Sequence, residues 1–259
     1  WQASAGAWGT PSFFELTFGM ALVHFAQSKC DVVVLETGMG GRLDSTNVIP
    51  APEVAVVTNI GLDHQAFLGP DIRSIAKEKG GIFKDGVPVV LGPMRPEAQS
   101  ELLAAALRSS SEVHFARDLE AEASAHLHEE ASFVTRQNLS TALATVKVLQ
   151  ANDWEVPEEA LQSGLADYAT ITGQRGRWQE VDVPGQPLVI LDGAHNVDGV
   201  AAMVRALEAK TQSRRGMLWV IWGAVADKDH HEVMSVLPEN ASYVWCAADI
   251  PRAMEASKV

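Results

Sequence analysis

Apolar and polar residues follow two patterns along this chain, one typical of helices and one typical of strands. After Ser12, a typical N-cap residue, apolar side chains recur at helical spacing. Short runs of β-branched and other apolar residues instead predict buried strands. On these grounds the first part of the chain is predicted to hold helices at 12–27, 71–79, 96–108 and 138–149, and strands at 31–36, 54–59 and 87–91.

The alternation resumes after a polar, glycine-containing stretch at 150–173. The second series is predicted to hold strands at 188–192, 217–223 and 243–247, and helices near 199–209 and 229–236. Strand–helix alternation produces mostly parallel sheets covered by helices on both faces. The predicted fold class is therefore α/β with two doubly wound sheets, in a central domain over residues 1–165 and a smaller Rossmann-like domain over residues 174–259.

Composition and charge narrow the classes of function. The chain has 259 residues, and 33 acidic against 20 basic residues give a net charge of −13. This charge disfavours nucleic-acid binding, and an anionic substrate would need local cations or a metal. No apolar run approaches the roughly 20 residues of a membrane-spanning helix. Cys30 and Cys246 are predicted to be buried thiols in a reducing compartment. We therefore expect a cytoplasmic monomer without nucleic-acid or membrane partners.

A glycine-dense turn follows the first predicted strand. The strand ends at Glu36, and the sequence continues Thr-Gly-Met-Gly-Gly-Arg-Leu-Asp-Ser-Thr-Asn to position 47. An open α/β sheet delivers acidic residues to its functional edge in this way. Within the turn, Asp44 and Asn47 either bond to the backbone and fix the turn, or contact a substrate.

The second predicted strand ends in a comparable block, Thr-Asn-Ile-Gly-Leu-Asp-His at 58–64. Two neighbouring strand ends would then present Glu36 and the Asp63/His64 pair. Such a set suits a hard divalent cation and a phosphate-bearing ligand. The alternative is an ordinary strand followed by an ordinary loop.

Further blocks extend this pattern along the chain. They are Ile-Ala-Lys-Glu-Lys-Gly-Gly-Ile-Phe-Lys at 75–84, Gly-Arg-Trp at 176–178, Leu-Asp-Gly-Ala-His-Asn at 191–196 and Asp-Lys-Asp at 227–229. Together with 36–47 and 58–64, these blocks resemble, in the same order, those of the folylpolyglutamate synthase/dihydrofolate synthase family in the Mur ligase superfamily. The resemblance implies a Mur-ligase-like ATP-binding central domain and a C-terminal ligase domain.

The resemblance implies a magnesium site formed by Glu36, His64 and Lys79. The matching lysine of the family is commonly carbamylated by CO₂, which turns a cation into a carboxylate-like ligand and requires a neutral amine. Lys79 is alternatively a solvated helix lysine. His64 is alternatively a hydrogen-bonded histidine at a strand end, since magnesium prefers oxygen ligands. Asp63 would orient the imidazole or the loop.

On the nucleotide side the resemblance implies four residues. Asp192 would contact the nucleotide, and His195 would face both the nucleotide and the incoming amino acid as a catalytic residue. Arg177 would bind phosphate through its planar guanidinium, and Asn138 would touch the adenine. The alternatives are a helix N-cap for Asn138 and a helix-capping cluster around Asp192.

One family motif does not occur in these residues, the phosphate loop Gly-x-x-x-x-Gly-Lys-Ser/Thr. Family members carry it upstream of the position that matches Trp1. The chain also stops at Val259, within the C-terminal domain, and the join at 134–138 is short relative to the family. We therefore expect the sequence to be part of a longer protein, and these residues alone are not expected to bind or hydrolyse ATP properly.

The chemistry that the resemblance implies is carboxylate activation. ATP phosphorylates a carboxylate to an acyl phosphate, which the amine of L-glutamate then attacks. Folate or dihydropteroate would be the acceptor, with ATP and Mg²⁺ as cofactors. Two alternatives stay open. One is a Mur-type peptide ligase of cell-wall synthesis, and the other is a non-catalytic binding protein derived from the ligase.

Overall fold

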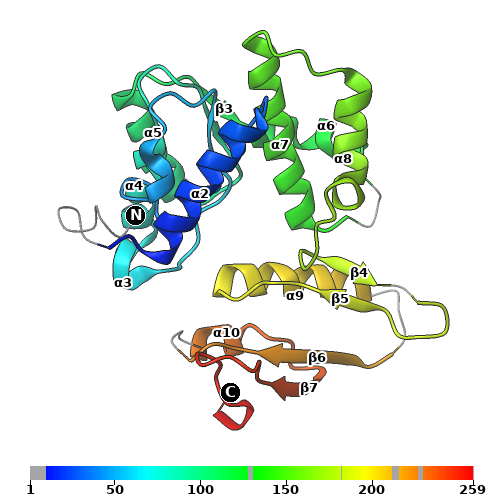
Figure 1. Cartoon of the computed structure of the whole chain (residues 1–259). Helices are drawn as coiled ribbons and strands as arrows, with labels where there is room; N and C mark the ends of the chain where they lie inside the picture. Colours follow the sequence, from blue (N-terminus) through cyan, green and yellow to red (C-terminus); the bar gives the residue numbers. More distant parts are fainter. Residues whose placement is uncertain (1–9, 128–130, 182, 212–215, 227–229, 259) are drawn as a thin grey trace. The chain divides into compact units, whose positions relative to one another are not determined.

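The computed structural model describes residues 10–127, 131–181, 183–211, 216–226 and 230–258 (Figure 1). The chain forms two compact units, Trp1–Ile60 with His64–His114, and Gly61–Asp63 with Phe115–Val259. The short segment Gly61–Asp63 thus belongs with the second unit, although its neighbours in sequence belong to the first. The domain limits at residues 165 and 174 stay a prediction.

The first unit contains a short sheet of apolar strands. β1 (Ala55–Val57) pairs in parallel with β2 (Val89–Leu91), and β3 (Val113–Phe115) lies on the other side of β2. β2 is buried along its whole length, as expected for a central strand. The helices of this unit are α2 (Phe13–Ser28), η1 (Ser45–Val48), α3 (Gln65–Leu68), α4 (Ile72–Lys79), η2 (Gly80–Ile82) and α5 (Pro96–Arg108).

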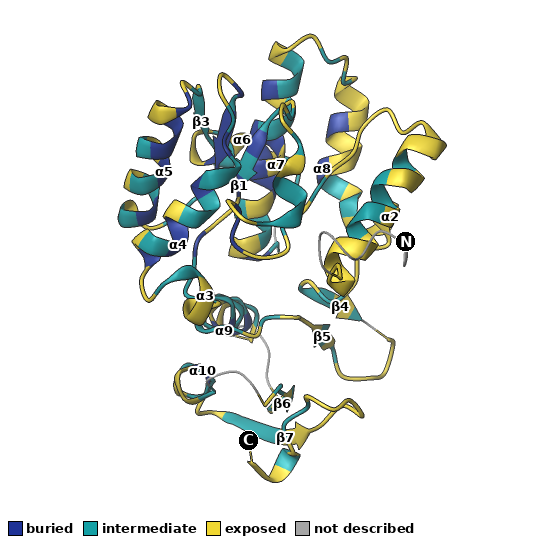
Figure 2. Ribbon diagram, turned by 60° about the vertical axis from the view of Figure 1, so that its left-hand side comes forward, coloured by how far each residue is buried: buried dark blue, intermediate teal, exposed yellow. Residues whose placement is uncertain are grey.

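Helices α4 and α5 pack against one another, and both were predicted from the sequence. The carboxylate of Asp71 caps α4 by accepting a hydrogen bond from the Ser74 N–H at 2.8 Å, and Pro96 opens α5. Each helix buries one apolar stripe (Figure 2). Gly80 is buried between the two helices. A Cβ atom at this position would lie only 2.9 Å from the Cβ of Ala105. The glycine therefore permits the close approach of α5.

Helix α2 begins as predicted but buries none of its side chains in the described structure. The Ser12 N–H donates to Glu15 Oε2 at 2.7 Å and the Glu15 N–H donates to Ser12 Oγ at 3.2 Å, which is a capping box. The predicted strand at 31–36 is wrong, and Val34 in it is 89% exposed. A strand needs a neighbour for its backbone N–H and C=O groups, and no described strand pairs with this run.

The second unit combines helices with two short strand pairs. β4 (Gln179–Val181) pairs antiparallel with β5 (Val189–Leu191), and β6 (Leu218–Gly223) pairs in parallel with β7 (Ala241–Cys246). An α/β fold with mostly parallel sheets is therefore confirmed, and β4–β5 is its antiparallel exception. The helices are η3 (Ala116–Leu119), α6 (Glu120–Ala125), α7 (Phe133–Ala151), α8 (Glu158–Thr172), α9 (Val197–Thr211), α10 (His231–Ser235) and η4 (Ala256–Lys258).

Helix α7 begins at Phe133, earlier than the sequence pattern predicts. Ser132 is its N-cap, since the Ser132 Oγ accepts a hydrogen bond from the Thr135 N–H at 3.1 Å. Asn138 consequently lies inside the helix with an exposed side chain, so its interpretation as an N-cap is wrong. The core that α7 shares with α6 and α8 consists of Ala123, Leu139, Leu143, Leu161 and Leu165.

Cys30 and Cys246 are both exposed, so the prediction of buried thiols is wrong. Cys30 follows α2, which has no buried face, and Cys246 ends β7 in a two-stranded sheet. An apolar run is buried only where another helix or strand covers it. Among the described helices none is long and apolar enough to cross a membrane.

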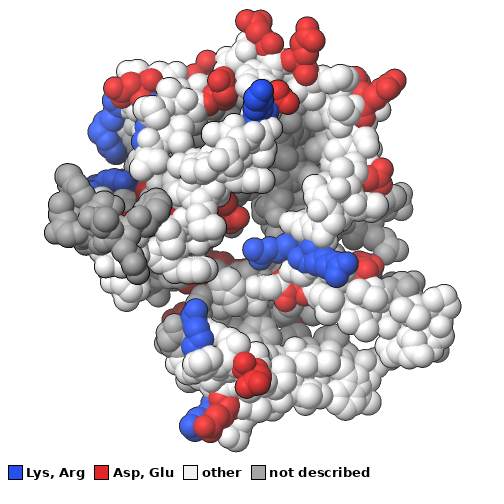
Figure 3. All heavy atoms as spheres, in the orientation of Figure 1, with Lys and Arg blue, Asp and Glu red and all other residues white. Residues whose placement is uncertain are grey.

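Acidic side chains lie on the surface where α7 is joined to α8. Asp153, Glu155, Glu158 and Glu159 are all exposed there. Figure 3 shows acidic side chains gathered over this end of the two helices. Part of the net negative charge is therefore carried by the connection between these two helices.

Candidate active site

The glycine-dense turn after Glu36 packs against the end of α4. A Cβ atom on Gly41 would lie 2.8 Å from the Glu78 carbonyl oxygen, and Gly40 has a positive φ of 66°. Both positions therefore require glycine, the first for close approach and the second for its backbone conformation. Glu36 itself is exposed, in an extended segment that precedes this turn.

The polar residues of the turn form hydrogen bonds and an ion pair with neighbouring parts of the first unit. The Arg42 guanidinium pairs with Glu78 Oε1 at 3.0 Å. The Asn47 side-chain amide donates to the carbonyl oxygens of Arg42 at 3.2 Å and Gly81 at 3.0 Å. The Lys84 ammonium donates to the Asn47 carbonyl at 3.2 Å. These contacts favour the structural interpretation of Asn47 over substrate contact, and they connect the turn to the residues around Lys79.

Asp44 closes the turn from within. One carboxylate oxygen accepts the Met39 N–H at 2.8 Å, and the other accepts the Thr46 N–H at 2.9 Å and the Thr46 hydroxyl at 2.6 Å. Partial burial by itself would raise the pKa of the Asp44 carboxyl, but the hydrogen bonds from Thr46, Met39 and Gly38 outweigh it and the pKa is lowered. Asp44 is thus best described as a turn residue.

Replacing Asp44 by alanine is expected to lower the free energy of unfolding at pH 7 by about 1 kcal/mol, because partly exposed hydrogen bonds are lost. A lowered folded-state pKa stabilises the fold above the ordinary carboxyl range, and that contribution disappears as the pH falls through the folded-state pKa. Urea unfolding of both proteins from pH 7 to pH 3 measures the difference. A difference that stays constant or grows towards pH 3 would contradict the assignment.

His64 and Lys79 both lie at helix ends in the first unit. His64 precedes α3, has a positive φ of 53°, and is exposed. Lys79 is the last residue of α4 and is partly buried. Left-handed backbone is uncommon for a residue other than glycine, so the conformation of His64 marks a locally constrained turn.

The three predicted metal ligands differ in how readily they would bind a cation. Among the described residues, no group of three or more His, Cys, Asp or Glu side chains is arranged to hold a metal ion. Glu36 and His64 offer one carboxylate and one imidazole, and Lys79 offers a suitable oxygen donor only as its carbamate. With that modification the donor set fits a divalent cation, and without it the set is poor in oxygen for magnesium.

In the second unit, the block before β4 and the block after β5 lie side by side, because these two strands pair with one another. The Gly193 N–H donates to the Gly176 carbonyl at 2.9 Å. The carboxylate of Asp192 accepts hydrogen bonds from the backbone N–H groups of Trp178 at 2.7 Å and Ala194 at 2.8 Å. Asp192 therefore ties the loop of Arg177 to the loop that leads into α9. Arg177 lies in the first of these two loops and is exposed.

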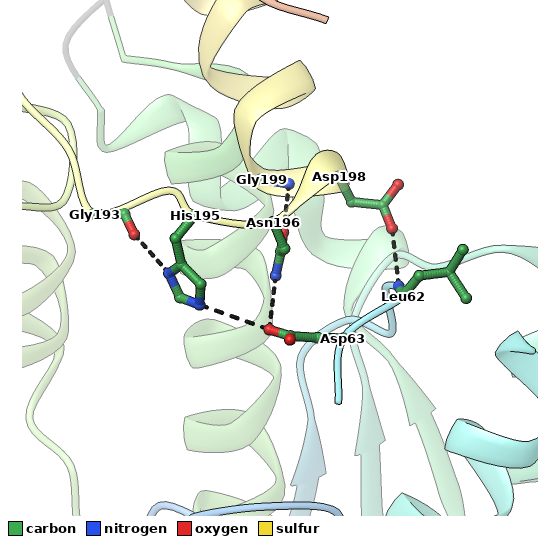
Figure 4. A network of polar contacts seen from close by, with 7 residues as sticks. All are labelled: Leu62, Asp63, Gly193, His195, Asn196, Asp198 and Gly199. Atoms are coloured by element: carbon green, nitrogen blue, oxygen red, sulfur yellow. Dashed lines mark hydrogen bonds and ion pairs between the residues drawn. The ribbon is translucent and has the colours of Figure 1, made fainter. Parts of the chain in front are cut away.

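A polar network lies where the second loop enters α9 (Figure 4). Asn196 caps the helix, since its Oδ1 accepts the Gly199 N–H at 2.9 Å. Its Nδ2 donates to Asp63 Oδ2 at 3.2 Å, and the same oxygen lies 3.6 Å from His195 Nε2. The capping interpretation of this block thus holds for Asn196, whereas the contact with Asp63 was not predicted.

This network was not predicted, because Asp63 is separated from His195 and Asn196 by more than a hundred positions. Asp63 was expected to orient an imidazole or its own loop, with His64 as its neighbour in sequence. It instead contacts His195, and the adjacent Leu62 N–H donates to Asp198 Oδ2 at 3.3 Å. No feature of the sequence indicates that Asp63 contacts His195 rather than its neighbour His64. The predicted block at 227–229 lies outside the described residues.

Two known protein families match the two parts of the chain. The Mur ligase middle domain matches residues 11–150, and the Mur ligase glutamate ligase domain matches residues 176–259. Together they define a protein of the Mur ligase class. Within this class, the chain belongs to the folylpolyglutamate synthase/dihydrofolate synthase family.

Individual relatives support this assignment. The chain is 34% identical to the dihydrofolate synthase/folylpolyglutamate synthase of Bacillus subtilis, over 95% of the chain and 60% of the relative. It is also 34% identical to that of Escherichia coli, over 91% of the chain and 56% of the relative. The chain therefore spans less than two thirds of the length of these relatives.

Solved structures of similar proteins contain ligands. Escherichia coli FolC in complex with DHPP and ADP has a TM-score of 0.80 and 28% identity, covering 99% of the chain and 62% of that structure. A bifunctional folylpolyglutamate synthase/dihydrofolate synthase with Mn, AMPPNP and L-glutamate bound has a TM-score of 0.76 and 28% identity, with the same coverage of both chains. The α/β fold of the chain is thus that of proteins that bind nucleotides.

Proposed function

We propose that the full-length protein is an ATP-dependent ligase that adds L-glutamate to folate or dihydropteroate through an acyl phosphate. The observation that carries this proposal is that one chain joins a Mur ligase middle domain to a glutamate ligase domain. Relatives of the same fold are described with DHPP, ADP, L-glutamate and an ATP analogue. In this proposal residues 1–165 form the central domain and residues 174–259 the ligase domain.

The loops around α9 supply the groups of the nucleotide side. Arg177 has an exposed guanidinium that can bind phosphate oxygens in a bidentate manner. Asp192 fixes the backbone of both loops, so its contribution includes positioning as well as any contact with the nucleotide. His195 has a half-exposed imidazole that can donate hydrogen bonds to a phosphate or carboxylate. Asn138, exposed on α7, would contact the adenine.

Three residues of the first unit would hold the metal. Glu36, His64 and carbamylated Lys79 are the ligands in this proposal. When bound, a divalent cation would neutralise phosphate charge and polarise the acceptor carboxylate. The protein residues then have to position the two substrates and exclude water from the acyl phosphate, since an acyl phosphate hydrolyses readily.

A ligation assay tests the proposed activity. The full-length protein is incubated with ATP, Mg²⁺ and radiolabelled L-glutamate, with dihydropteroate, folate or a cell-wall nucleotide peptide as acceptor. Glutamate incorporation into a pterin, dependent on ATP, is the expected result. Incorporation only into the nucleotide peptide would favour the Mur-type peptide ligase. Absence of incorporation with every acceptor, in a folded protein, would favour a binding protein.

Replacing Arg177 by alanine is expected to raise the KM for ATP about 10-fold to 150-fold, which corresponds to one lost charge-assisted hydrogen bond. The affinity for the pterin is expected to remain within about twofold, because Arg177 belongs to the second unit and the proposed metal ligands belong to the first. Steady-state kinetics and pterin binding measure both effects. Arg175, exposed two residues earlier, gives the matched control, and an equal effect of Arg175→Ala would contradict a specific role.

A further inference from the structure

The segment before His64 is held by residues at the start of α9. A Cβ atom on Gly61 would lie 2.6 Å from Asp198 Oδ2, and the Leu62 N–H donates to the same oxygen at 3.3 Å. A side chain at this position would displace the Asp198 carboxylate. The contacts explain why Gly61–Asp63 belongs to the second unit while Ile60 and His64 belong to the first.

The carboxylate of Asp63 reaches two neighbouring residues of that unit. Its Oδ2 lies 3.2 Å from Asn196 Nδ2 and 3.6 Å from His195 Nε2 (Figure 4). The first distance is a hydrogen bond, and the second is an ion-pair distance. The Asp63 side chain is 27% exposed, so this pairing is partly shielded from water.

The orientation of Asn196 is fixed by its two partners. Oδ1 accepts the Gly199 N–H and Nδ2 donates to Asp63. Exchanging the two ends of the amide would set a donor against the Gly199 donor and an acceptor against the carboxylate, so only the observed orientation satisfies both. Asp63 is therefore connected through Asn196 to the first turn of α9.

The imidazole of His195 is bracketed by two oxygen atoms. Nδ1 lies 2.9 Å from the Gly193 carbonyl oxygen, and Nε2 faces Asp63. Both oxygens are acceptors, so a ring nitrogen that carries a proton can donate to the oxygen it faces. These two contacts define the plane of a ring that is otherwise 58% exposed. Without the carboxylate, only one side of the ring is fixed.

We propose that Asp63 is a positioning residue for His195. Its carboxylate holds the imidazole in the orientation in which the ring meets its substrate, and Asn196 holds the carboxylate. The inference rests on the proposed function for the role of His195, but the contact itself can be tested without catalysis.

The kinetic test compares Asp63→Asn with Asp85→Asn in the full-length ligase. Asp85 is exposed in a turn, so the second variant removes the same charge elsewhere. Asp63→Asn can still accept the bond from Asn196 and is expected to fold normally. It is expected to lower kcat about 10-fold to 100-fold, with a change of less than about threefold in the KM for ATP. A normal kcat in Asp63→Asn would overturn the proposal.

A double variant separates positioning from independent effects. His195→Gln combined with Asp63→Asn is expected to be no slower than His195→Gln alone, because Asp63 acts through the imidazole. If the loss of kcat in the double variant equals the product of the losses in the two single variants, the proposal is contradicted. Asp63→Glu is expected to recover part of kcat, since it returns the charge with one more methylene, and recovery no better than Asp63→Asn would also count against the proposal.

A spectroscopic test does not depend on ligase activity. In protein labelled with ¹⁵N-histidine, the His195 ring resonances, assigned from their loss in His195→Gln, are expected to shift in Asp63→Asn and to stay unchanged in Asp85→Asn. Unchanged resonances in Asp63→Asn would overturn the contact. If the wild-type protein ligates no acceptor but the resonances shift, the proposed function fails while the contact between Asp63 and His195 stands.

Discussion

Lys79→Ala in the full-length protein is expected to lower the turnover of ligation by at least about 100-fold, because a metal ligand is lost. Lys79 is expected to act as its carbamate. An unmodified lysine about 4 Å from a divalent cation would be repelled by several kcal/mol at an intermediate dielectric, whereas the carbamate reverses the charge and supplies oxygen donors. Steady-state ligation kinetics measure the loss.

Two further variants distinguish the carbamate from a cation. Lys79→Arg is expected to be as inactive as Lys79→Ala, because guanidinium keeps its charge and is not carbamylated. Acetate is expected to restore part of the activity of Lys79→Ala by supplying a carboxylate. Full activity in Lys79→Arg would contradict the carbamate. Lys77→Ala is the matched control, as Lys77 is exposed on the same helix.

These variants are expected to remain folded. Lys79 is the last residue of α4, and alanine has the highest helix propensity. The buried stripe of α4 consists of Ile72, Ile75 and Ala76, none of which is altered. Thermal unfolding that matches the wild-type protein would therefore accompany the loss of turnover.

Glu36→Ala is expected to abolish ligation, also by about 100-fold or more, while leaving the free energy of unfolding nearly unchanged. Glu36 is exposed in a segment without strand pairing, so removal of its side chain creates no cavity. Loss of a carboxylate ligand would weaken binding of the cation that offsets phosphate charge. Ligation rates at increasing magnesium concentration measure the effect.

Glu36→Gln separates charge from shape, since the amide is nearly isosteric with the carboxylate. It is expected to lose most of the activity as well. Asp31→Asn, in the same exposed segment, is the control for loss of a charge. Near-normal turnover of Glu36→Ala in saturating magnesium would remove Glu36 from the metal site.

Local sequence signals predicted the helices well where a cap and an apolar stripe coincide. The capping box of Ser12 and Glu15 begins α2 where expected, and Asp71 begins α4. The start of α7 was missed because Asn138 resembles a cap, while Ser132 makes the capping bond. Capping depends on the hydrogen bond formed, and two suitable residues a few positions apart cannot be ranked from residue type.

Burial was less predictable than local conformation. The apolar run at 31–36 and the thiol Cys246 were both expected to be covered, and both are exposed. Val89 and Val90 in β2, with similar residues, are fully buried. The difference is the presence of neighbouring elements on both sides of β2, which the residues of the strand itself do not encode.

The sequence by itself determined the family, the α/β class and the residue types of the candidate site, because ordered motifs and apolar periodicity are local properties. Only the tertiary structure decided that Asp192 joins the loop before β4 to the loop after β5 and that Asp63 contacts His195 rather than serving only its own turn. The contact of Asp63 with His195 joins residues more than a hundred positions apart, and its formation depends on the packing of whole elements, which no single segment specifies.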